Sequence, residues 1–489
     1  MTSVCLRLPA DGLLRWHEDL VAALRKGGHT VGVELRAIVA REPPALSLLG
    51  EVERLLFVRG RADALSPSTS RDWARAEAGP FDLAFDLTGA AAIEPGVLGL
   101  CYDGALGDAA RDAALLEGRA PRVSLARACV DGRIERLSDA LPANERPDLL
   151  HAGRVAIASR AALLILRFLD GAPLSFLPAA EIGCGRPVAF LSGALVEKAR
   201  NRLRRLLVHD RHWTIAWRRP AERDALADAR AWPRADWRRL ADDRRRYYAD
   251  PLPFEEEGRL FVFCEEYPYA TQKGVISVFE IDAAGRPSAP RIVLERPYHL
   301  SYPFVFRYGG AIWMMPETSA ARTLELYRAE AFPDRWTLDR VLMRDVDLAD
   351  ATIFEADGRW WLTAASSEGG SSWDCLSIYV GPGPLGPWRR IGEGPVLIDA
   401  SSARPAGRAI RRGDAFWRPA QDCAQGYGGG LALCRIDRLD EAGFAQSVET
   451  RVGPPPGLDA VGAHTLGYAC GFEIIDFCAA RAKFAGGRA

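Results

Sequence analysis

The stretch DATIFEADGRWWL, residues 350–362, decides the fold class of the C-terminal half of this chain. It begins with an acid, continues as an alternating apolar strand, turns at a glycine and ends near two tryptophans. The stretches YPFVFRYGGAIWM (302–314) and DPLPFEEEGRLFV (250–262) repeat the pattern. When the three are aligned on the turn glycine, one offset holds Asp250, Tyr302 and Asp350, and another holds Phe254, Phe306 and Phe354. The shared register marks a structural repeat.

A repeat of roughly 50 residues with several short strands per unit is typical of a β-propeller blade. Two looser copies, ARPAGRAIRRGDAFWRP (403–419) and GAHTLGYACGFEIIDF (462–477), bring the number of units to five. A β-sandwich with chance similarity is the alternative, and three copies in register favour the propeller. The sequence therefore predicts a five-bladed β-propeller over residues 246–489.

The innermost strand of each propeller blade begins near the central channel, so the heads of the repeats are expected to converge at one mouth. The head positions are Asp250, Tyr302, Asp350, the region of Arg404, and His464. The strands also carry polar residues further along: Glu265 and Glu317 each lie seven residues after a turn glycine, Glu266 follows Glu265, and blade four carries Arg418, Gln421 and Asp422. We expect these side chains to line one funnel.

Two carboxylates across a channel suit glycosidic chemistry, in which one carboxylate acts as nucleophile or base while a second, protonated carboxyl group acts as acid. We assign Asp250 as nucleophile or base, Asp350 to orient substrate or tune a neighbour, and Glu317 or Glu265 as the acid. The predicted substrate contacts are Tyr302, Arg404, Arg418, Gln421, Asp422, His464 and Glu266, with Arg404, Arg418 and His464 holding an anionic group.

Each of these residues also has a structural interpretation. Asp250 and Asp350 are placed where aspartates cap backbone groups at strand starts. Glu265, Glu266 and Glu317 stand on apolar strands and need partners if they are buried, and Arg418 is a candidate partner. His464 is equally compatible with a purely structural role.

Residues 1–170 alternate between strand and helix patterns, for example SVCLRL (3–8) followed by an amphipathic helix over 12–28, with a long helix over 148–171 closing the region. This alternation predicts an open, mostly parallel sheet in a Rossmann-like α/β domain. No GxGxxG or P-loop pattern marks a nucleotide site, so the sequence assigns no cofactor.

Residues 171–245 are predicted to be a basic helical connector. The helix expected over 193–213 has an Arg-rich face, which fits either contact with an anionic membrane surface or a solvated connector. The solvated connector is the favoured interpretation because the basic patch covers one short helix only.

The net charge, the cysteine pattern and the absence of long apolar runs argue against some classes of protein. Lys+Arg 63 against Asp+Glu 64 leaves a net charge of −1, which argues against a nucleic-acid binder. The ten cysteines form no CxxC pair and no metal-ligand spacing, so we predict reduced thiols. A metal in the channel stays an open alternative, since the acids there are oxygen ligands, although no ligand spacing identifies one. The start lacks a signal-peptide pattern, and no run of about 18 apolar residues occurs. We therefore expect a cytoplasmic protein, peripheral to the inner membrane if the basic helix binds lipid.

Several motifs together carry a family resemblance: PYHLSYPFVF, MMPETSAARTLELYRAEAFPDRW, DATIFEADGRWWL, ARPAG, WRPAQDCAQGYG and AHTL. They resemble the N-terminal propeller domain of plant glucosamine inositolphosphorylceramide transferases and its bacterial relatives, over about residues 240–480. That domain is similar in fold to arabinanase/levansucrase-type propellers, in which acids heading blades one and three and a Glu on blade four carry catalysis. The resemblance implies that Asp250 and Asp350 match the first two acids, whereas blade four offers Arg418, Gln421 and Asp422 and no Glu. The separate glycosyltransferase domain of the plant enzymes is not recognised in this sequence.

Residues 1–170 are weakly similar to the N-terminal domain of formyltransferases, on the stretches FDLAFDLTG and LGLCYDGALGD. The catalytic Asn, His and Asp motif of that family is not visible, so the resemblance implies a degenerate domain.

Three functional hypotheses follow from the sequence. The first is a carbohydrate-active enzyme that transfers or cleaves a glycosyl group on a surface glycan or glycolipid, with a carbohydrate or sugar-nucleotide substrate in the propeller mouth. The second is formyl transfer to an amino sugar by the N-terminal domain. The third is a glycan-binding protein without catalysis.

Overall fold

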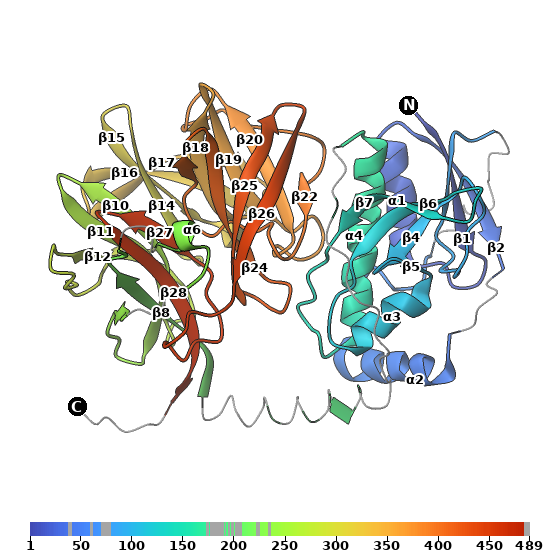
Figure 1. The fold of residues 1–489 in the computed structure, drawn as a ribbon, viewed down its shortest axis with the longest axis horizontal. Helices are drawn as coiled ribbons and strands as arrows, with labels where there is room; N and C mark the ends of the chain where they lie inside the picture. Colours follow the sequence, from blue (N-terminus) through green and yellow to red (C-terminus); the bar gives the residue numbers. More distant parts are fainter. Residues whose placement is uncertain are drawn as a thin grey trace. The chain divides into compact units, whose positions relative to one another are not determined.

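In the computed structural model the chain divides into two compact units, residues 1–200 with 369–371 and residues 201–368 with 372–489 (Figure 1). The structure describes residues 1–37, 42–58, 62–69, 80–172, 208–221, 225–232 and 236–483, together with positions 176, 190, 192–193, 196 and 200. Within this described part, no helix is both long enough and apolar enough to cross a bilayer.

The N-terminal unit is built on a sheet with strand order β2-β1-β3-β4-β6-β7, with β5 paired to β4. The strands are β1 (Ser3–Pro9), β2 (Thr30–Arg36), β3 (Leu83–Asp86), β4 (Leu98–Tyr102), β5 (Ala105–Leu106), β6 (Val123–Ala128) and β7 (Ile134–Ala140). The helical elements are α1 (Arg15–Lys26), α2 (Pro44–Glu53), the π-helical turn η1 (Arg54–Val58), α3 (Asp108–Leu116) and α4 (Leu150–Leu169). Helix α4 packs against β6 and β7 and against α1 and α3.

The sheet of this unit is mixed rather than mostly parallel. Strands β2, β1, β3 and β4 pair in parallel, whereas the pairs β4–β5, β4–β6 and β6–β7 are antiparallel. The helices expected over 12–28 and 148–171 correspond to α1 and α4. The Rossmann-like class and the similarity to formyltransferases are not confirmed and stay predictions.

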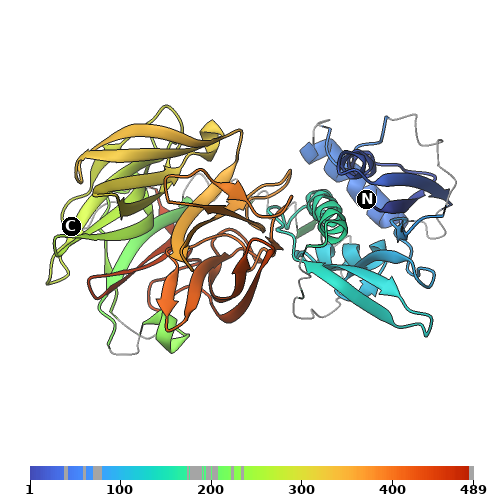
Figure 2. The same ribbon diagram turned by 90° about the horizontal axis from the view of Figure 1, so that it is seen from above.

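The second unit is a five-bladed propeller, as the repeat predicts. Blade one is β10 (Arg246–Glu256), β11 (Arg259–Pro268), β12 (Val275–Ile281) and β13 (Arg291–Leu294), and blade two is β14 (Ser301–Tyr308), β15 (Ala311–Glu317), β16 (Thr323–Ala331) and β17 (Arg335–Arg344). Blade three is β18 (Leu348–Ala356), β19 (Arg359–Ser366), β20 (Cys375–Gly381), β21 (Arg389–Arg390) and β22 (Leu397–Ile398). Blade four is β23 (Ile410–Arg412), β24 (Ala415–Asp422), β25 (Gly430–Asp440) and β26 (Gly443–Val452). In Figure 2 these blades run from green through yellow to orange in chain order.

The fifth blade joins both ends of the propeller segment. Its strand order is β27-β28-β8-β9, in which β27 (Leu466–Ala469) and β28 (Phe472–Ala482) are C-terminal, whereas β8 (Val208–Arg218) and β9 (Arg238–Arg239) precede blade one. Strand β8 pairs antiparallel with β28 over its whole length (Figure 1). This pairing closes the ring, because it joins the start and the end of the propeller segment by hydrogen bonds within one blade.

This closure differs from the expectation that residues 171–245 form only a helical connector. Residues 208–218 and 238–239 are propeller strands, and between them lies the single-turn helix α6 (Leu226–Ala229). The helix expected over 193–213 ends in strand β8, and residues 194–195, 197–199 and 201–207 lie outside the described residues. The alternating pattern HWTIAWR (212–218) explains why this segment is a strand, because one face of β8 is buried against blade one.

The propeller core consists of apolar clusters between successive blades. One cluster joins blades five and one through Ile215, Trp217 and Phe279, another joins blades one and two through Phe263 and Tyr327, and further clusters join the remaining pairs. A short 3₁₀ turn, η3 (Ser319–Ala321), connects β15 to β16 in blade two. Because each blade contributes to two clusters, the blade heads are held in a fixed circular arrangement.

We predict that Trp217→Ala destabilises the propeller by about 3–5 kcal/mol, the usual cost of truncating a buried tryptophan. Trp217 is 1% exposed, its ring lies 6.1 Å from that of Phe279, and its Nε1–H donates to the carbonyl of Gly285 (3.0 Å). The measurement is the midpoint of the propeller transition in scanning calorimetry. Val461→Ala, at a position 60% exposed, is the matched control and leaves the midpoint unchanged. If the two substitutions lower the midpoint equally, the result contradicts a stabilising contact between β8 and blade one.

Candidate functional site

The innermost strands of blades one, two and three share one backbone irregularity. Their pairing register shifts between Ala249 and Leu252, between Ser301 and Phe304, and between Ala349 and Thr352. At each shift one residue adopts a positive φ: 51° for Asp250, 44° for Tyr302 and 54° for Asp350. Such β-bulges re-aim a side chain, and they recur beside functional sites. The offset that aligns these three residues in the sequence is thus the position of the bulge.

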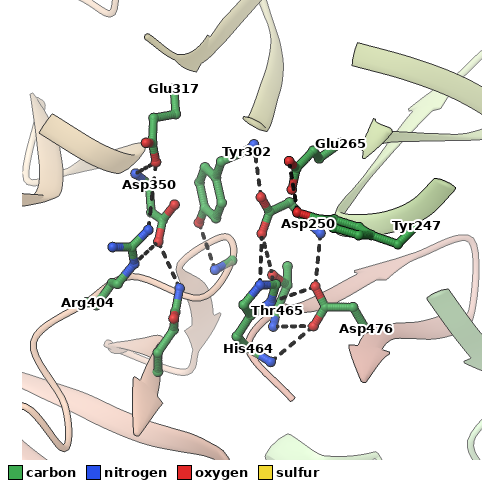
Figure 3. Close-up of polar contacts among 12 residues, drawn as sticks. Tyr247, Asp250, Glu265, Tyr302, Glu317, Asp350, Arg404, His464, Thr465 and Asp476 are labelled. Atoms are coloured by element: carbon green, nitrogen blue, oxygen red, sulfur yellow. Dashed lines mark hydrogen bonds and ion pairs between the residues drawn. The ribbon is translucent and has the colours of Figure 1, made fainter. Parts of the chain in front are cut away.

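Asp250 lies at the centre of the first polar group (Figure 3). Its Oδ2 accepts from the backbone N–H of Tyr302 (3.2 Å) and its Oδ1 from the hydroxyl of Thr465 (3.2 Å), while Nε2 of His464 lies 3.8 Å away. The carboxyl group is almost closed to solvent, with Asp250 5% exposed. Burial raises its pKa above the usual range, and His464 opposes this shift while Asp476 and Glu317 add to it.

His464 is held between two carboxylates and an aromatic face. Its Nδ1 lies 2.6 Å from Oδ2 of Asp476, and its ring stacks on that of Trp213 at 3.8 Å. Burial lowers the pKa of His464, but the carboxylates of Asp476 and Asp250 outweigh burial, so the pKa ends above its ordinary value. An imidazolium in this position stabilises a negative charge on Asp250.

Asp350 forms the second polar group, next to blade four. Its Oδ2 accepts from Nε of Arg404 (2.6 Å) and from the amide of Gln421 (2.8 Å), and its backbone N–H donates to Glu317 (3.3 Å). Burial raises the pKa of the Asp350 carboxyl to about 8; Arg404 opposes the shift, whereas Glu317 and Asp250 increase it. Arg404 also lies 3.8 Å from Glu317 and faces the ring of Tyr427, so its charge is already neutralised.

Tyr302 connects the two groups. Its hydroxyl shares a hydrogen bond with that of Thr352 (2.8 Å) and accepts from the backbone N–H of Gly407 (2.8 Å). Gly407 has φ 136°, and a Cβ there would lie 2.0 Å from the carbonyl oxygen of Leu466, so only glycine permits this approach. Hydrogen bonds through Tyr302 therefore connect Asp250 of blade one with Thr352 of blade three and with Gly407, which precedes blade four.

Glu265 and Glu317 come from the second strands of blades one and two; Glu265 lies beside Asp250, and Glu317 lies beside Asp350 (Figure 3). Burial, with added repulsion from Asp250 and Glu317, raises the pKa of Glu265 well above its usual value. Its Oε1 has weak partners, the hydroxyl of Tyr247 (3.5 Å) and Nε2 of His299 (3.4 Å). Glu317 has closer donors: the hydroxyl of Ser319 (2.6 Å) as well as the backbone N–H of Asp350.

The structure does not bring every expected residue to this centre. Glu266 forms an ion pair with Arg246 and accepts from the hydroxyl of Ser277 (2.6 Å). It adjoins Glu265 on a strand, so the two side chains point to opposite faces.

Two residues of blade four also have partners of their own. Arg418 donates to the carbonyl of Ser402 and to Gln446 (3.3 Å), and in the described chain it makes no ion pair with Glu265 or Glu317. The suggestion that Arg418 neutralises these glutamates is therefore wrong. Asp422 accepts from the backbone N–H of Ala424 (3.1 Å) and lies 3.8 Å from Arg451.

Sequence reasoning missed other members of the site: Asp476, Thr465, Tyr247, Trp213 and Tyr427. Asp476 is fully buried and accepts the backbone N–H groups of Asp250 (2.9 Å), His464 (3.0 Å) and Thr465 (2.9 Å). The stretch FEIIDF contains the signal that singled out Glu265 and Glu317, an acid within an apolar strand.

Asp250, His464 and Asp476 also form a donor set for a metal ion. One ligand atom from each lies within 4.8 Å of the others. Metal binding requires a neutral imidazole, whereas the contacts of His464 with two carboxylates favour the protonated ring. Asp476 already occupies Nδ1 of His464, and no step proposed below passes through an ion.

Comparison with known proteins supports the resemblance expected for this segment. Residues 238–453 match the family model described as glucosamine inositolphosphorylceramide transferase 1, N-terminal. Over 205 residues the chain is 36% identical to glucosamine inositolphosphorylceramide transferase 1 of Oryza sativa subsp. japonica and 32% identical to that of Arabidopsis thaliana. Each match covers 41% of this chain and 27% of the relative, so the chain matches about a quarter of the length of these relatives.

Among solved structures, a family 117 glycoside hydrolase produced by the marine bacterium Zobellia galactanivorans matches with a TM-score of 0.36 and 10% identity, covering 55% of this chain and 90% of that one. The predicted resemblance to the N-terminal domain of glucosamine inositolphosphorylceramide transferases is thus confirmed over residues 238–453.

Proposed function

We propose that this protein acts on a carbohydrate at the propeller mouth, where it transfers or cleaves a glycosyl group on a surface glycan or a glycolipid. The observation that carries the proposal is the convergence of four acids from three blades: Asp250, Glu265, Glu317 and Asp350. The match to enzymes named glucosamine inositolphosphorylceramide transferase 1 supports the substrate class.

Glu265 fits the role of general acid better than Glu317. A general acid must hold its proton at the working pH, and burial among other carboxylates raises the pKa of Glu265. Both oxygens of Glu317 already accept hydrogen bonds, one from the hydroxyl of Ser319 and the other from the backbone N–H of Asp350, whereas Glu265 has only weak partners.

Asp250 is the proposed nucleophile or base. The donors around it, the N–H of Tyr302 and the hydroxyl of Thr465, fix the orientation of its carboxylate, and His464 supplies a nearby positive charge. Burial raises its pKa above the usual range, which increases its strength as a base once it is ionised.

Asp350 is proposed to orient the substrate. Arg404 and Gln421 both donate to Oδ2, while in the described chain Oδ1 has no hydrogen-bond partner. An acceptor atom held in this way suits a sugar hydroxyl. The anion grip expected from Arg404 and His464 is not part of the proposal, because carboxylates already neutralise both cations.

We predict that Asp350→Asn reduces turnover because it disturbs the orientation of the substrate, and that Asp250→Asn reduces turnover by about 10²–10⁴-fold, the usual size of a general acid–base contribution, while ligand binding persists in both. Asparagine keeps the shape and one acceptor oxygen but cannot act as a base. The measurement screens sugar nucleotides and glycolipids for turnover with the unmodified protein, and then compares the variants on the first substrate found. Binding is followed by thermal shift.

Asp357→Asn is the matched control, because Asp357 lies in an exposed turn of the same blade as Asp350 and has a similar positive φ, 52° against 54°. It leaves turnover unchanged. Full turnover in both site variants contradicts the catalytic roles. Saturable glycan binding with no turnover of any donor instead supports the glycan-binding hypothesis.

We predict that Glu265→Gln abolishes turnover and stabilises the protein increasingly as pH rises. The folded-state pKa of Glu265 is raised above its unfolded value of about 4.3, so above that pH the folded protein keeps a proton that the unfolded chain loses. The free energy of unfolding therefore falls as pH rises, and glutamine removes this loss. The measurement is the difference in melting temperature between variant and parent from pH 4 to pH 9.

Glu266→Gln is the contrasting substitution on the same strand. Glu266 holds the guanidinium of Arg246, so loss of its charge lowers the melting temperature. A gain in stability from Glu266→Gln, or a difference for Glu265→Gln that does not grow with pH, contradicts this account of the buried acids.

A further inference from the structure

The N-terminal unit contains a cavity of about 250 Å³ that the propeller chemistry does not use. It lies at the carboxyl ends of the parallel strands β1, β3 and β4, and its walls include Asp11 after β1, Asp86 at the end of β3 and Tyr102 at the end of β4. Ligands of open α/β sheets bind outside the carboxyl ends of the strands.

His17 supplies a buried donor to this cavity. It is 2% exposed and lines the cavity from the first turn of α1. Its Nδ1 accepts from the backbone N–H of Leu14 (3.2 Å), which leaves the proton on Nε2. Burial lowers the pKa of His17 to about 4, so the ring is neutral at physiological pH. In the described chain the Nε2–H has no partner.

Two carboxylates of the wall lack a basic partner among the described residues. Asp86 accepts only from the backbone N–H (3.0 Å) and hydroxyl (2.6 Å) of Thr88, both through Oδ1, so its Oδ2 remains available. Asp11 is exposed at the cavity and makes no hydrogen bond or ion pair in the described chain.

The two arginines of the wall are already neutralised. Arg111 pairs with Asp108 (2.9 Å) and Asp112 (2.9 Å), and Arg154 pairs with Asp112 (2.7 Å) and Glu42 (2.6 Å). The cavity therefore favours a cation over an anion.

The remaining wall is apolar and of a size for one ring. Leu14, Leu100 and Ile157 line it, with the half-buried Trp16 beside His17. Local hydrogen bonds occupy only one polar atom of each of these side chains. The start of α1 uses Nδ1 of His17, and the turn at Thr88 uses Oδ1 of Asp86. The other nitrogen and the other oxygen are left for a ligand.

We propose that this cavity binds a small, ring-sized molecule that carries a protonated amine and at least one acceptor oxygen. The amine lies against Asp86 and Asp11, and the acceptor oxygen receives the Nε2–H of His17. The apolar wall covers the face of the ring.

The test is titration calorimetry of the full chain with D-glucosamine, with D-glucose as the uncharged analogue and inorganic phosphate as the anion. We expect saturable binding of glucosamine, at least tenfold weaker binding of glucose, and no binding of phosphate. Asp86→Asn weakens glucosamine binding at least tenfold and glucose binding less, because only glucosamine loses a charge pair.

Asp131→Asn is the control, an exposed carboxylate of the same unit that pairs with Arg133 outside the cavity, and it leaves binding unchanged. Asp11→Asn provides a second test at an exposed position if Asp86→Asn impairs folding, which circular dichroism reports. The proposal is overturned if glucosamine shows no saturable binding, if neither cavity variant weakens it, or if Asp350→Asn in the propeller weakens it instead.

Discussion

The propeller centre depends on one repeated interaction: a carboxylate accepts the backbone N–H of the bulge residue on the next blade. Asp476 of blade five accepts from Asp250 of blade one, Asp250 accepts from Tyr302 of blade two, and Glu317 of blade two accepts from Asp350 of blade three. A bulge removes its residue from the strand ladder, so its N–H is buried without a ladder partner. The acids satisfy these groups and at the same time tie neighbouring blades together.

The same interaction concentrates negative charge where the blades meet. The capping carboxylates are buried beside Asp350 and Glu265, and burial with mutual repulsion raises the pKa values of Asp250, Asp350 and Glu265. Arg404 and His464 offset part of this repulsion. Capping and catalysis are therefore not competing explanations for Asp250, because its carboxylate is oriented by a backbone donor and its raised pKa suits proton transfer.

The sequence predicted the parts of this arrangement that repeat locally. The common offset of Asp250, Tyr302 and Asp350 from the turn glycine is visible because bulge, strand and turn lie within one hairpin. Asp476 breaks that register: it lies five residues after Gly471, whereas Glu265 and Glu317 lie seven residues after their glycines.

Other features depend on contacts between residues far apart in the sequence, which a local repeat does not predict. Strand β8 pairs with β28 across more than 250 residues, so its place in blade five follows from ring closure and not from any local pattern. The adjacent acids Glu265 and Glu266 show the opposite case, since strand alternation alone separates them onto two faces. One then lies beside Asp250, and the other pairs with Arg246.

Tyr302 shows why the repeat is not exact. An aspartate in its place would add a further carboxylate between Asp250 and Asp350, where burial and repulsion already raise both pKa values. The tyrosine fills the same bulge without charge, and its hydroxyl reaches Thr352 on blade three and the backbone of Gly407 before blade four. A positive φ is uncommon for tyrosine, so its backbone strain must be offset by these contacts. The asymmetry of the ring, two acids separated by a neutral bridge, thus follows from the limit on buried charge at its centre.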